Sequence, residues 1–255
     1  MRYFKDSIAV SPHRDLPLLR QVMHSKYVTE TQLWQFMEHR GCERNKGSFW
    51  WRVKRLTEHR LVARHLLPMV NREPIYAITP SGLVYLIENC SVPYGGPKGG
   101  PDIRADGAGV AHALGVNGVH LDLLRGARLL SWEYETEIRY RSESIGAPYA
   151  KIYDAIATVA LAGRQLRFAL EYERTPKAKV EYDNIESAIG RERSLDRVLY
   201  LACTRQIHWL LTQRSWRIPQ QVLIGLASDL GKSEFADLHV FDARTERTCR
   251  LIDVP

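Results

Sequence analysis

Three carboxylates near the ends of two predicted strands are the residues of this chain most suited to chemistry. Glu171 and Glu173 stand two residues apart at the end of the alternating run 164–173 (RQLRFALEYE), so they project from the same face of a strand. Asp154 lies near the start of a second β-like run, 153–161 (YDAIATVAL). Carboxylate oxygens at the ends of adjacent strands are common ligands of Mg2+. The sequence therefore predicts an acidic site in which Asp154 and Glu171 are the candidate metal ligands.

Such an acidic site needs cations or a metal ion, because unpartnered carboxylates at close range repel one another. Arg174 and Lys179 follow Glu173 closely in the sequence and are the candidate neutralising groups. The cluster also has a simpler interpretation, in which ion pairs hold a former catalytic site together and no reaction takes place. The candidate catalytic residues are therefore the three carboxylates and Lys179.

The elements that would position this site are three consecutive strands in a meander, two of which form a hairpin at Gly163. The first strand is predicted over 131–140 (SWEYETEIRY), where alternation puts Glu133, Glu135 and Glu137 on one face. These glutamates face water on a half-covered strand, or one of them joins the site as a fourth acid. The other predicted elements are a helix over 108–130 broken at 115–118, a helix over 176–191, strands over 198–203, 222–227 and 238–241, and a helix over 205–216.

A second group of candidate residues lies nearer the N-terminus, where basic and aromatic side chains share one short helix. Between positions 43 and 65 the chain carries seven basic residues and two acidic ones. The predicted helix is capped by Ser48 and buries Phe49, Val53 and Leu56. A basic helix with an exposed aromatic residue suits the major groove of DNA. The candidate DNA-contacting residues are Ser48, Trp51, Arg52, Lys54 and Arg55 of this helix, with Asn71 and Arg72 at the tip (69–74) of the hairpin that follows.

Short helices are predicted on either side of this basic helix. A helix over 15–25 comes first, and Thr29 with Gln32 forms the capping box of the next one. After the hairpin, Thr79 caps a last helix with proline at its first position. This order over residues 15–90, together with the stretches RLTEHRLV and YAITPSGLVYL, resembles a winged helix-turn-helix domain. The basic helix would then be a DNA-recognition helix or, in the alternative interpretation, an ordinary solvated helix of a protein-binding domain.

A glycine- and proline-rich stretch, 91–107 (SVPYGGPKGGPDIRADG), separates the two regions. Its five glycines and three prolines favour a linker without packed elements. An ordered surface loop anchored by Tyr94 and Ile103 is the alternative. The expected domains are therefore residues 1–90 and residues 108–255.

The order of elements after residue 108 resembles the restriction-endonuclease-like, PD-(D/E)XK fold. Tyr153-Asp154 stands where that fold has Pro-Asp, and Glu171-Tyr172-Glu173 stands where it has E-x-K. The resemblance implies that Asp154 and Glu171 bind metal and position the attacking water. Glu173 departs from the motif, because a carboxylate cannot stabilise developing negative charge as the lysine does. The lysines that could take over this role are Lys151, Lys177 and Lys179.

The combination of the two regions resembles the replication-relaxation family. The resemblance covers about residues 15–215 and is carried by YDAI (153–156), LEYERT (170–175), a lysine-bearing segment and Tyr182. Members occur on plasmids and integrated mobile elements, and some are described as conjugation or replication accessory proteins. The expected fold is therefore a two-domain chain of α+β and α/β class, with an N-terminal winged helix-turn-helix and a C-terminal restriction-endonuclease-like mixed sheet flanked by helices.

Three functions from different classes fit these features. The first is a double-stranded DNA-binding protein of a mobile genetic element that controls replication, transfer or transcription. Its nuclease-like domain would be degenerate and would form a homodimer or bind replication or transfer proteins. The second is a DNA endonuclease that depends on Mg2+, the one cofactor expected. The third is a protein-binding adaptor without a DNA role.

The composition of the chain agrees with an anionic partner. The 255 residues carry a net charge of +7, and the isoelectric point is about 9.3. The N-terminus lacks the apolar core of a signal peptide and no run is long enough to span a membrane, so we expect a cytoplasmic protein with no membrane partner. The four cysteines lie far apart and predict neither a disulfide framework nor a zinc ribbon.

Overall fold

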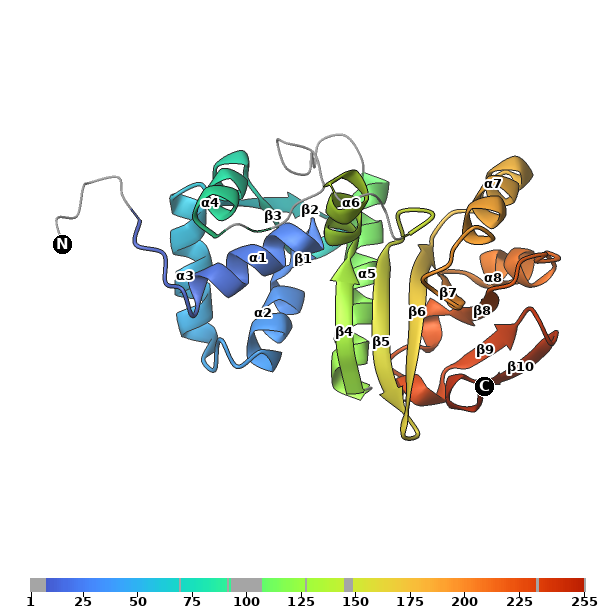
Figure 1. Cartoon of the computed structure of the whole chain (residues 1–255). Helices are drawn as coiled ribbons and strands as arrows, with labels where there is room; N and C mark the ends of the chain where they lie inside the picture. Colours follow the sequence, from blue (N-terminus) through green and yellow to red (C-terminus); the bar gives the residue numbers. More distant parts are fainter. Residues whose placement is uncertain are drawn as a thin grey trace. The chain divides into compact units, whose positions relative to one another are not determined.

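The computed structural model describes residues 8–68, 70–90, 92, 107–126, 128–144, 149–232 and 234–254 (Figure 1). The chain divides into two compact units, residues 1–117 and residues 118–255, and both combine helices with strands. The predicted linker over 91–107, with Tyr94 and Ile103, lies outside the described residues except for Val92 and Gly107. The predicted domain limits at 90 and 108 therefore stay predictions.

The first unit begins with three helices, α1 (Asp15–Ser25), α2 (Glu30–His39) and α3 (Lys46–Glu58). The Thr29 hydroxyl accepts a hydrogen bond from the Gln32 backbone N–H, and the Gln32 side chain accepts one from the Thr29 N–H, which confirms the predicted capping box. The cap of α3 is Asn45, whose side chain accepts a hydrogen bond from the Ser48 backbone N–H at 3.1 Å. The prediction of Ser48 as the cap is therefore wrong by three residues, because asparagine satisfies the free backbone donor earlier in the chain.

The first unit also contains a three-stranded sheet and a fourth helix. The sheet has the order β1-β3-β2, and these elements are β1 (Val28–Thr29), β2 (Val62–Leu67), β3 (Asn71–Ile78) and α4 (Pro80–Cys90). Asn71 pairs with Leu67, so Asn71 and Arg72 belong to β3 and the prediction that they form the tip of the hairpin is wrong. The Thr79 hydroxyl accepts a hydrogen bond from the Gly82 N–H at 3.0 Å, as expected for the predicted cap of α4.

Helix α5 (Gly107–Gly126) is continuous, so the predicted break at 115–118 is wrong. The boundary between the compact units falls within this helix, after Asn117. The first half of α5 belongs to the first unit, where Val110 packs in an apolar cluster with Tyr27. The Asn117 side chain donates a buried hydrogen bond of 2.7 Å to the Tyr27 carbonyl, which fixes this half of the helix.

The second unit is built on a seven-stranded mixed sheet in the order β10-β9-β8-β7-β6-β5-β4. Its strands are β4 (Arg128–Tyr134), β5 (Ala155–Leu161), β6 (Arg164–Glu173), β7 (Arg197–Ala202), β8 (Gln221–Leu226), β9 (His239–Asp242) and β10 (Arg247–Arg250). β7 is parallel to both β6 and β8, and the other neighbouring pairs are antiparallel. The predicted meander β4-β5-β6 is confirmed, and Gly163 in the β5–β6 turn has a φ of +79°, which favours glycine.

The predicted strand over 131–140 is a strand only in its first part. β4 ends at Tyr134, and helix α6 (Glu135–Ser144) begins at the next residue. The Glu137 carboxylate accepts a hydrogen bond from the Tyr134 backbone N–H at 2.9 Å, which stabilises the start of the helix. Glu135 and Glu137 therefore lie on a helix, and the prediction that three glutamates share one strand face is wrong.

Helices cover both faces of the sheet of the second unit (Figure 1). The second half of α5 packs on one face, where Val119 lies in the same apolar cluster as Phe168. Helices α7 (Lys179–Ile189) and α8 (Arg205–Thr212) pack on the other face, through residues such as Ile207. The described residues also form three short 3-10 helices, η1 (Ala227–Asp229), η2 (Phe235–Asp237) and η3 (Leu251–Asp253).

Among the helices that the structure describes, none combines the length and the apolar character that a bilayer-spanning segment requires. All four cysteines are described, and each is a free thiol.

Candidate functional site

Strands β5, β6 and β7 bring the predicted carboxylates to one end of the sheet. Glu171 and Glu173 lie on the face of β6 that α7 and α8 cover, since Ala169 of the same alternation packs in the apolar cluster of that face. Tyr200 of β7 is the parallel partner of Glu171. Asp154 is the residue that directly precedes β5. The predicted hairpin therefore does place the three carboxylates in neighbouring positions.

Glu171 forms an ion pair with Lys151 and is 9% exposed. The Lys151 ammonium group also lies over the ring of Tyr153, 4.7 Å from its centroid. Burial raises the pKa of Glu171 to about 7; the Lys151 ammonium group acts to lower this pKa, and the nearby Asp154 carboxylate acts to raise it. Glu171 can therefore take up or release a proton close to neutral pH.

Glu173 forms an ion pair with Lys177 and is 4% exposed. The Lys177 ammonium group lies 5.8 Å from the centroid of the Tyr182 ring, and the Lys177 backbone N–H donates a 3.4 Å hydrogen bond to the Tyr182 hydroxyl. Lys179 is exposed, and among the described residues it pairs with neither glutamate. Of the three lysines that the sequence proposed for this role, Lys151 and Lys177 reach the carboxylates and Lys179 does not.

Asp154 holds the backbone of the hairpin. Its Oδ2 atom accepts a hydrogen bond from the Tyr172 N–H at 2.8 Å, and its own N–H donates to the Leu170 carbonyl at 3.2 Å. These two bonds hold the start of β5 against the end of β6. One oxygen of this carboxylate is therefore already used by the fold.

The donor atoms do not fit a divalent metal ion in the arrangement that the sequence motif implied. Each glutamate is paired with an ammonium group, and Asp154 is bound to backbone. In the part of the chain that the structure describes, no group of three or more His, Cys, Asp or Glu side chains is arranged to hold a metal ion. Binding of Mg2+ at Asp154 and Glu171 therefore stays a prediction.

A buried tyrosine opposite the glutamates was missed by the sequence analysis. Tyr200 is fully buried, and its hydroxyl has no hydrogen-bond partner within the described part of the chain. Burial, followed by the charges of Glu171 and Glu173, raises the pKa of this phenol well above its ordinary value. The hydroxyl is therefore protonated and can donate. In the sequence, the only indication of this residue was its hydroxyl group within the otherwise apolar run VLYLAC (198–203).

Glu133, one candidate for a fourth acid, belongs to a different polar network. Its carboxylate accepts hydrogen bonds from Arg141 at 2.9 Å, from the Tyr149 hydroxyl at 3.1 Å and from Arg167 at 3.4 Å. Glu135 and Glu137, the other candidates, lie on α6 and do not extend β4. The acidic site therefore consists of Asp154 and the two lysine-paired glutamates.

In the first unit, Arg52 of α3 points into the protein. It is 6% exposed, and it donates to Glu43 through Nε and to Asp15 through a terminal nitrogen, both at 2.6 Å. Asp15 is fully buried and Glu43 is 2% exposed. Arg52 therefore joins α3 to α1 and to the α2–α3 loop, and it is not available for the DNA contact that the sequence suggested.

Arg55 and Ser48 are also engaged within the first unit. Arg55 donates to Asp15 at 2.5 Å, and its guanidinium group stacks over Trp51 at 5.2 Å from the ring centroid. The Ser48 hydroxyl accepts a hydrogen bond from Arg14 at 2.7 Å. These two candidates therefore hold the fold together and leave little surface for a ligand.

The outward face of α3 carries Trp50, Trp51 and Lys54. Their spacing of three and four residues places them on one side of the helix. Trp50 is 51% exposed, Trp51 is 60% exposed, and the Lys54 side chain is 75% exposed. Trp51 and Lys54 were predicted on this face from the sequence, and Trp50 was not.

Other exposed basic side chains occur in the segments that flank this face. Of the seven basic residues between positions 43 and 65, all except Arg52 and Arg55 are exposed. The exposed basic residues of α3, its preceding loop and the hairpin are Arg44, Lys46, Lys54, Arg60, Arg64 and Arg72. This part of the chain therefore keeps most of its predicted positive surface.

The structure thus defines a mixed α/β protein with a basic, largely helical first unit and a second unit built on a seven-stranded mixed sheet. The chain belongs to the replication-relaxation family, because the model of that family matches residues 19–184, more than half of the sequence. The matched segment includes α3 and all three carboxylates. Comparisons with curated proteins and with solved structures gave no match. Family membership indicates a role in replication or in the function of mobile elements.

Proposed function

We propose that the first unit is a winged helix-turn-helix domain that binds double-stranded DNA. Helix α3 would enter the major groove, and the β2–β3 hairpin would be the wing. The observation that carries the proposal is the outward face of α3, where Trp50, Trp51 and Lys54 are exposed side by side. The element order α1-β1-α2-α3-β2-β3-α4 supports it, because recognition helices of this class occupy the position of α3.

The internal ion pairs of α3 support the proposal in a second way. Arg52 links α3 to Asp15 of α1 and to Glu43, so the exposed face is presented by a helix that cannot rotate freely. A rigidly held helix favours the affinity of a recognition surface, because less conformational freedom is lost on binding. The exposed basic residues around α3 remain available for phosphates.

The proposed contacts follow from the chemistry of each side chain. Lys54 contacts a phosphate, and the two tryptophans pack on sugars or on a thymine methyl group. Arg72 on the hairpin contacts the DNA backbone beside the groove that α3 occupies. Binding of this kind would serve the replication or mobile-element role of the family.

The second unit is proposed to act as a scaffold that binds a second copy of the chain or a replication or transfer protein. Its glutamates are neutralised by lysines, an arrangement that favours a structural over a nuclease role. DNA cleavage would require Glu171 and Glu173 to exchange their ammonium partners for a metal ion.

Anisotropy titrations of a labelled duplex against the full chain, repeated over a range of salt concentrations, test the DNA proposal. Lys54→Gln should weaken binding to all duplexes alike and reduce the slope of log affinity against log salt by about 1. Lys232→Gln is the matched control, because that lysine is also exposed but lies in the second unit. Its affinity and salt slope should equal those of the wild type.

The tryptophans provide a second, independent comparison in the same assay. Trp51→Ala should weaken duplex binding, whereas Trp209→Ala, at a tryptophan of α8 that is 59% exposed, should not. Wild-type affinity in both the Lys54 and the Trp51 variants would refute docking through this face. Absence of duplex binding by the wild type at low salt would favour the adaptor interpretation instead.

A further inference from the structure

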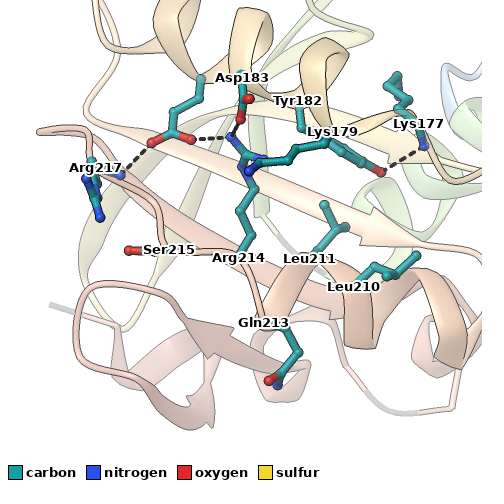
Figure 2. A pocket seen from close by; sticks show the side chains of 11 residues that line it. Lys177, Lys179, Tyr182, Asp183, Leu210, Leu211, Gln213, Arg214, Ser215 and Arg217 are labelled. Carbon is teal, nitrogen blue, oxygen red and sulfur yellow. Dashed lines mark hydrogen bonds and ion pairs between the residues drawn. The ribbon is translucent and has the colours of Figure 1, made fainter.

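A pocket of about 710 Å3 lies between α7 and the α8 region of the second unit (Figure 2). Leu210 and Leu211 of α8 form its apolar wall, with Tyr182 of α7. The volume lies within the range of about 300–1,000 Å3 that is usual for small-molecule sites. The pocket is therefore large enough for a ligand of nucleotide size.

Four cationic side chains line this pocket: Lys177, Lys179, Arg214 and Arg217. Two of them have carboxylate partners, because Lys177 pairs with Glu173 and Arg214 pairs with two acids of α7. The side chains of Lys179 and Arg217 have no carboxylate partner among the residues described. An ammonium group and a guanidinium group without internal partners are the groups that gain most from an anion.

Arg214 forms a fixed part of the pocket. It donates to Asp183 at 2.6 Å and to Glu186 at 2.5 Å. A dashed line in Figure 2 marks its contact with Asp183. Its guanidinium group also lies over the rings of Tyr182 and Trp216, at 5.7 and 5.3 Å from their centroids. Asp183 remains half exposed, so it can still accept hydrogen bonds at the rim. The pocket thus combines the cations of Lys179 and Arg217 with an apolar wall and a hydrogen-bond acceptor.

We propose that this pocket binds a small phosphorylated ligand of the nucleoside phosphate class. Lys179 and Arg217 hold the phosphate groups, the leucine wall contacts the base, and Asp183 accepts a hydrogen bond from a sugar hydroxyl. Lys179 is also the first residue of α7, and the positive end of that helix favours an anion at this position.

Lys177 connects the pocket to the acidic site. Its side chain lines the pocket and also forms the ion pair with Glu173. A phosphate in the pocket attracts the same ammonium group and so competes with Glu173. Ligand binding therefore competes with the Lys177–Glu173 ion pair, and removal of the Glu173 charge should strengthen ligand binding.

Calorimetric titration of the full chain with ATP and, separately, with inorganic phosphate tests this proposal. The wild type should bind ATP, and it should bind phosphate more weakly because phosphate does not reach the leucine wall. The double variant Lys179→Gln/Arg217→Gln should bind ATP at least about tenfold more weakly, which corresponds to about 1.4 kcal/mol. The control Lys232→Gln/Arg193→Gln, which removes the same charge outside the pocket, should bind like the wild type.

Two further variants separate the pocket from general charge effects and from misfolding. Lys179→Arg/Arg217→Lys keeps both charges and should retain ATP binding. Glu173→Gln should bind ATP more tightly than the wild type, whereas Glu246→Gln, the same charge change on an exposed turn, should not. The proposal is overturned if the wild type does not bind ATP, if inorganic phosphate binds as tightly as ATP, or if the pocket and control double variants lose binding equally.

Discussion

Replacement of Arg52 by methionine tests whether this arginine holds the fold together. The side chain makes two hydrogen bonds of 2.6 Å to the buried carboxylates of Asp15 and Glu43. Removal of one member of a buried ion pair costs about 3–5 kcal/mol, because the partner charge stays buried. Asp15 keeps Arg55 and Glu43 keeps Arg14, so we expect a loss near the lower end, about 3 kcal/mol.

The loss should depend on pH with a definite sign. Burial acts to raise the pKa of Asp15, but the Ser11 backbone N–H, Arg52 and Arg55 outweigh it and lower this pKa. A carboxyl group whose pKa is lowered in the folded state stabilises the protein at pH values above its unfolded-state pKa of about 3.9. This stability is lost as the pH falls through the folded-state pKa. The deficit of Arg52→Met should therefore be largest near pH 7 and should shrink as the solution approaches pH 4 and below.

Hydrogen exchange of α1 and α3 peptides across a urea series measures this stability within the first unit. Lys54→Met is the matched control on the same helix, since its side chain is 75% exposed, and its stability should stay within about 0.5 kcal/mol of the wild type. An Arg52→Met protein with wild-type stability and weakened duplex binding would refute the structural assignment and would restore Arg52 to the DNA-contacting set.

Two further changes test the packing of α4 and the burial of Glu171. Gly82→Ala should destabilise the first unit by about 1–3 kcal/mol in thermal unfolding, because the new Cβ would lie 2.1 Å from the Leu61 carbonyl oxygen. Gly118→Ala is the control and should not destabilise, because a Cβ at that position would meet no atom within 4 Å outside its own stretch of helix. Burial raises the pKa of Glu171 to about 7, so its contribution to stability is complete below the unfolded value of about 4.3 and is lost as the pH rises through 7. Glu171→Gln should remove this decline from urea titrations at pH 5 and pH 8, and an unchanged decline would contradict the assignment.

The elements that the sequence predicted well have local signals. Thr29 and Gln32 are three residues apart and satisfy each other's backbone within one helical turn. The alternation of β6 and the glycine at position 163 fix that hairpin in the same way, since each requirement is met by residues next to one another. Such features depend on the local sequence alone and need no knowledge of the fold.

The prediction over 131–140 failed because two local signals competed. Alternation continues through Glu135 and Glu137 and favours a strand, whereas a glutamate three residues after Tyr134 favours a helix start. The structure follows the second signal. A short alternating run of polar and apolar residues therefore does not distinguish a strand end from the first turn of a helix.

The inward orientation of Arg52 could have been predicted from the sequence. It stands three residues after Phe49 and four before Leu56, so it falls on the apolar stripe of α3. Its ion pair with Asp15 could not be predicted, because Asp15 lies 37 positions away in the sequence and only the tertiary fold brings its carboxylate to the helix. An arginine on an apolar stripe is better interpreted as a buried ion-pair partner than as a surface contact.

The two lysine–glutamate pairs of the acidic site differ in how readily they can open. The Lys151 side chain is 18% exposed and reaches Glu171 across 20 positions of sequence, whereas the Lys177 side chain is 33% exposed and lies only four residues after Glu173. Lys177 also borders the pocket, so solvent or an anion can draw its ammonium group away at a lower desolvation cost. If an anion opens one of these two ion pairs, it is therefore the Lys177–Glu173 pair, while Glu171 keeps its cation.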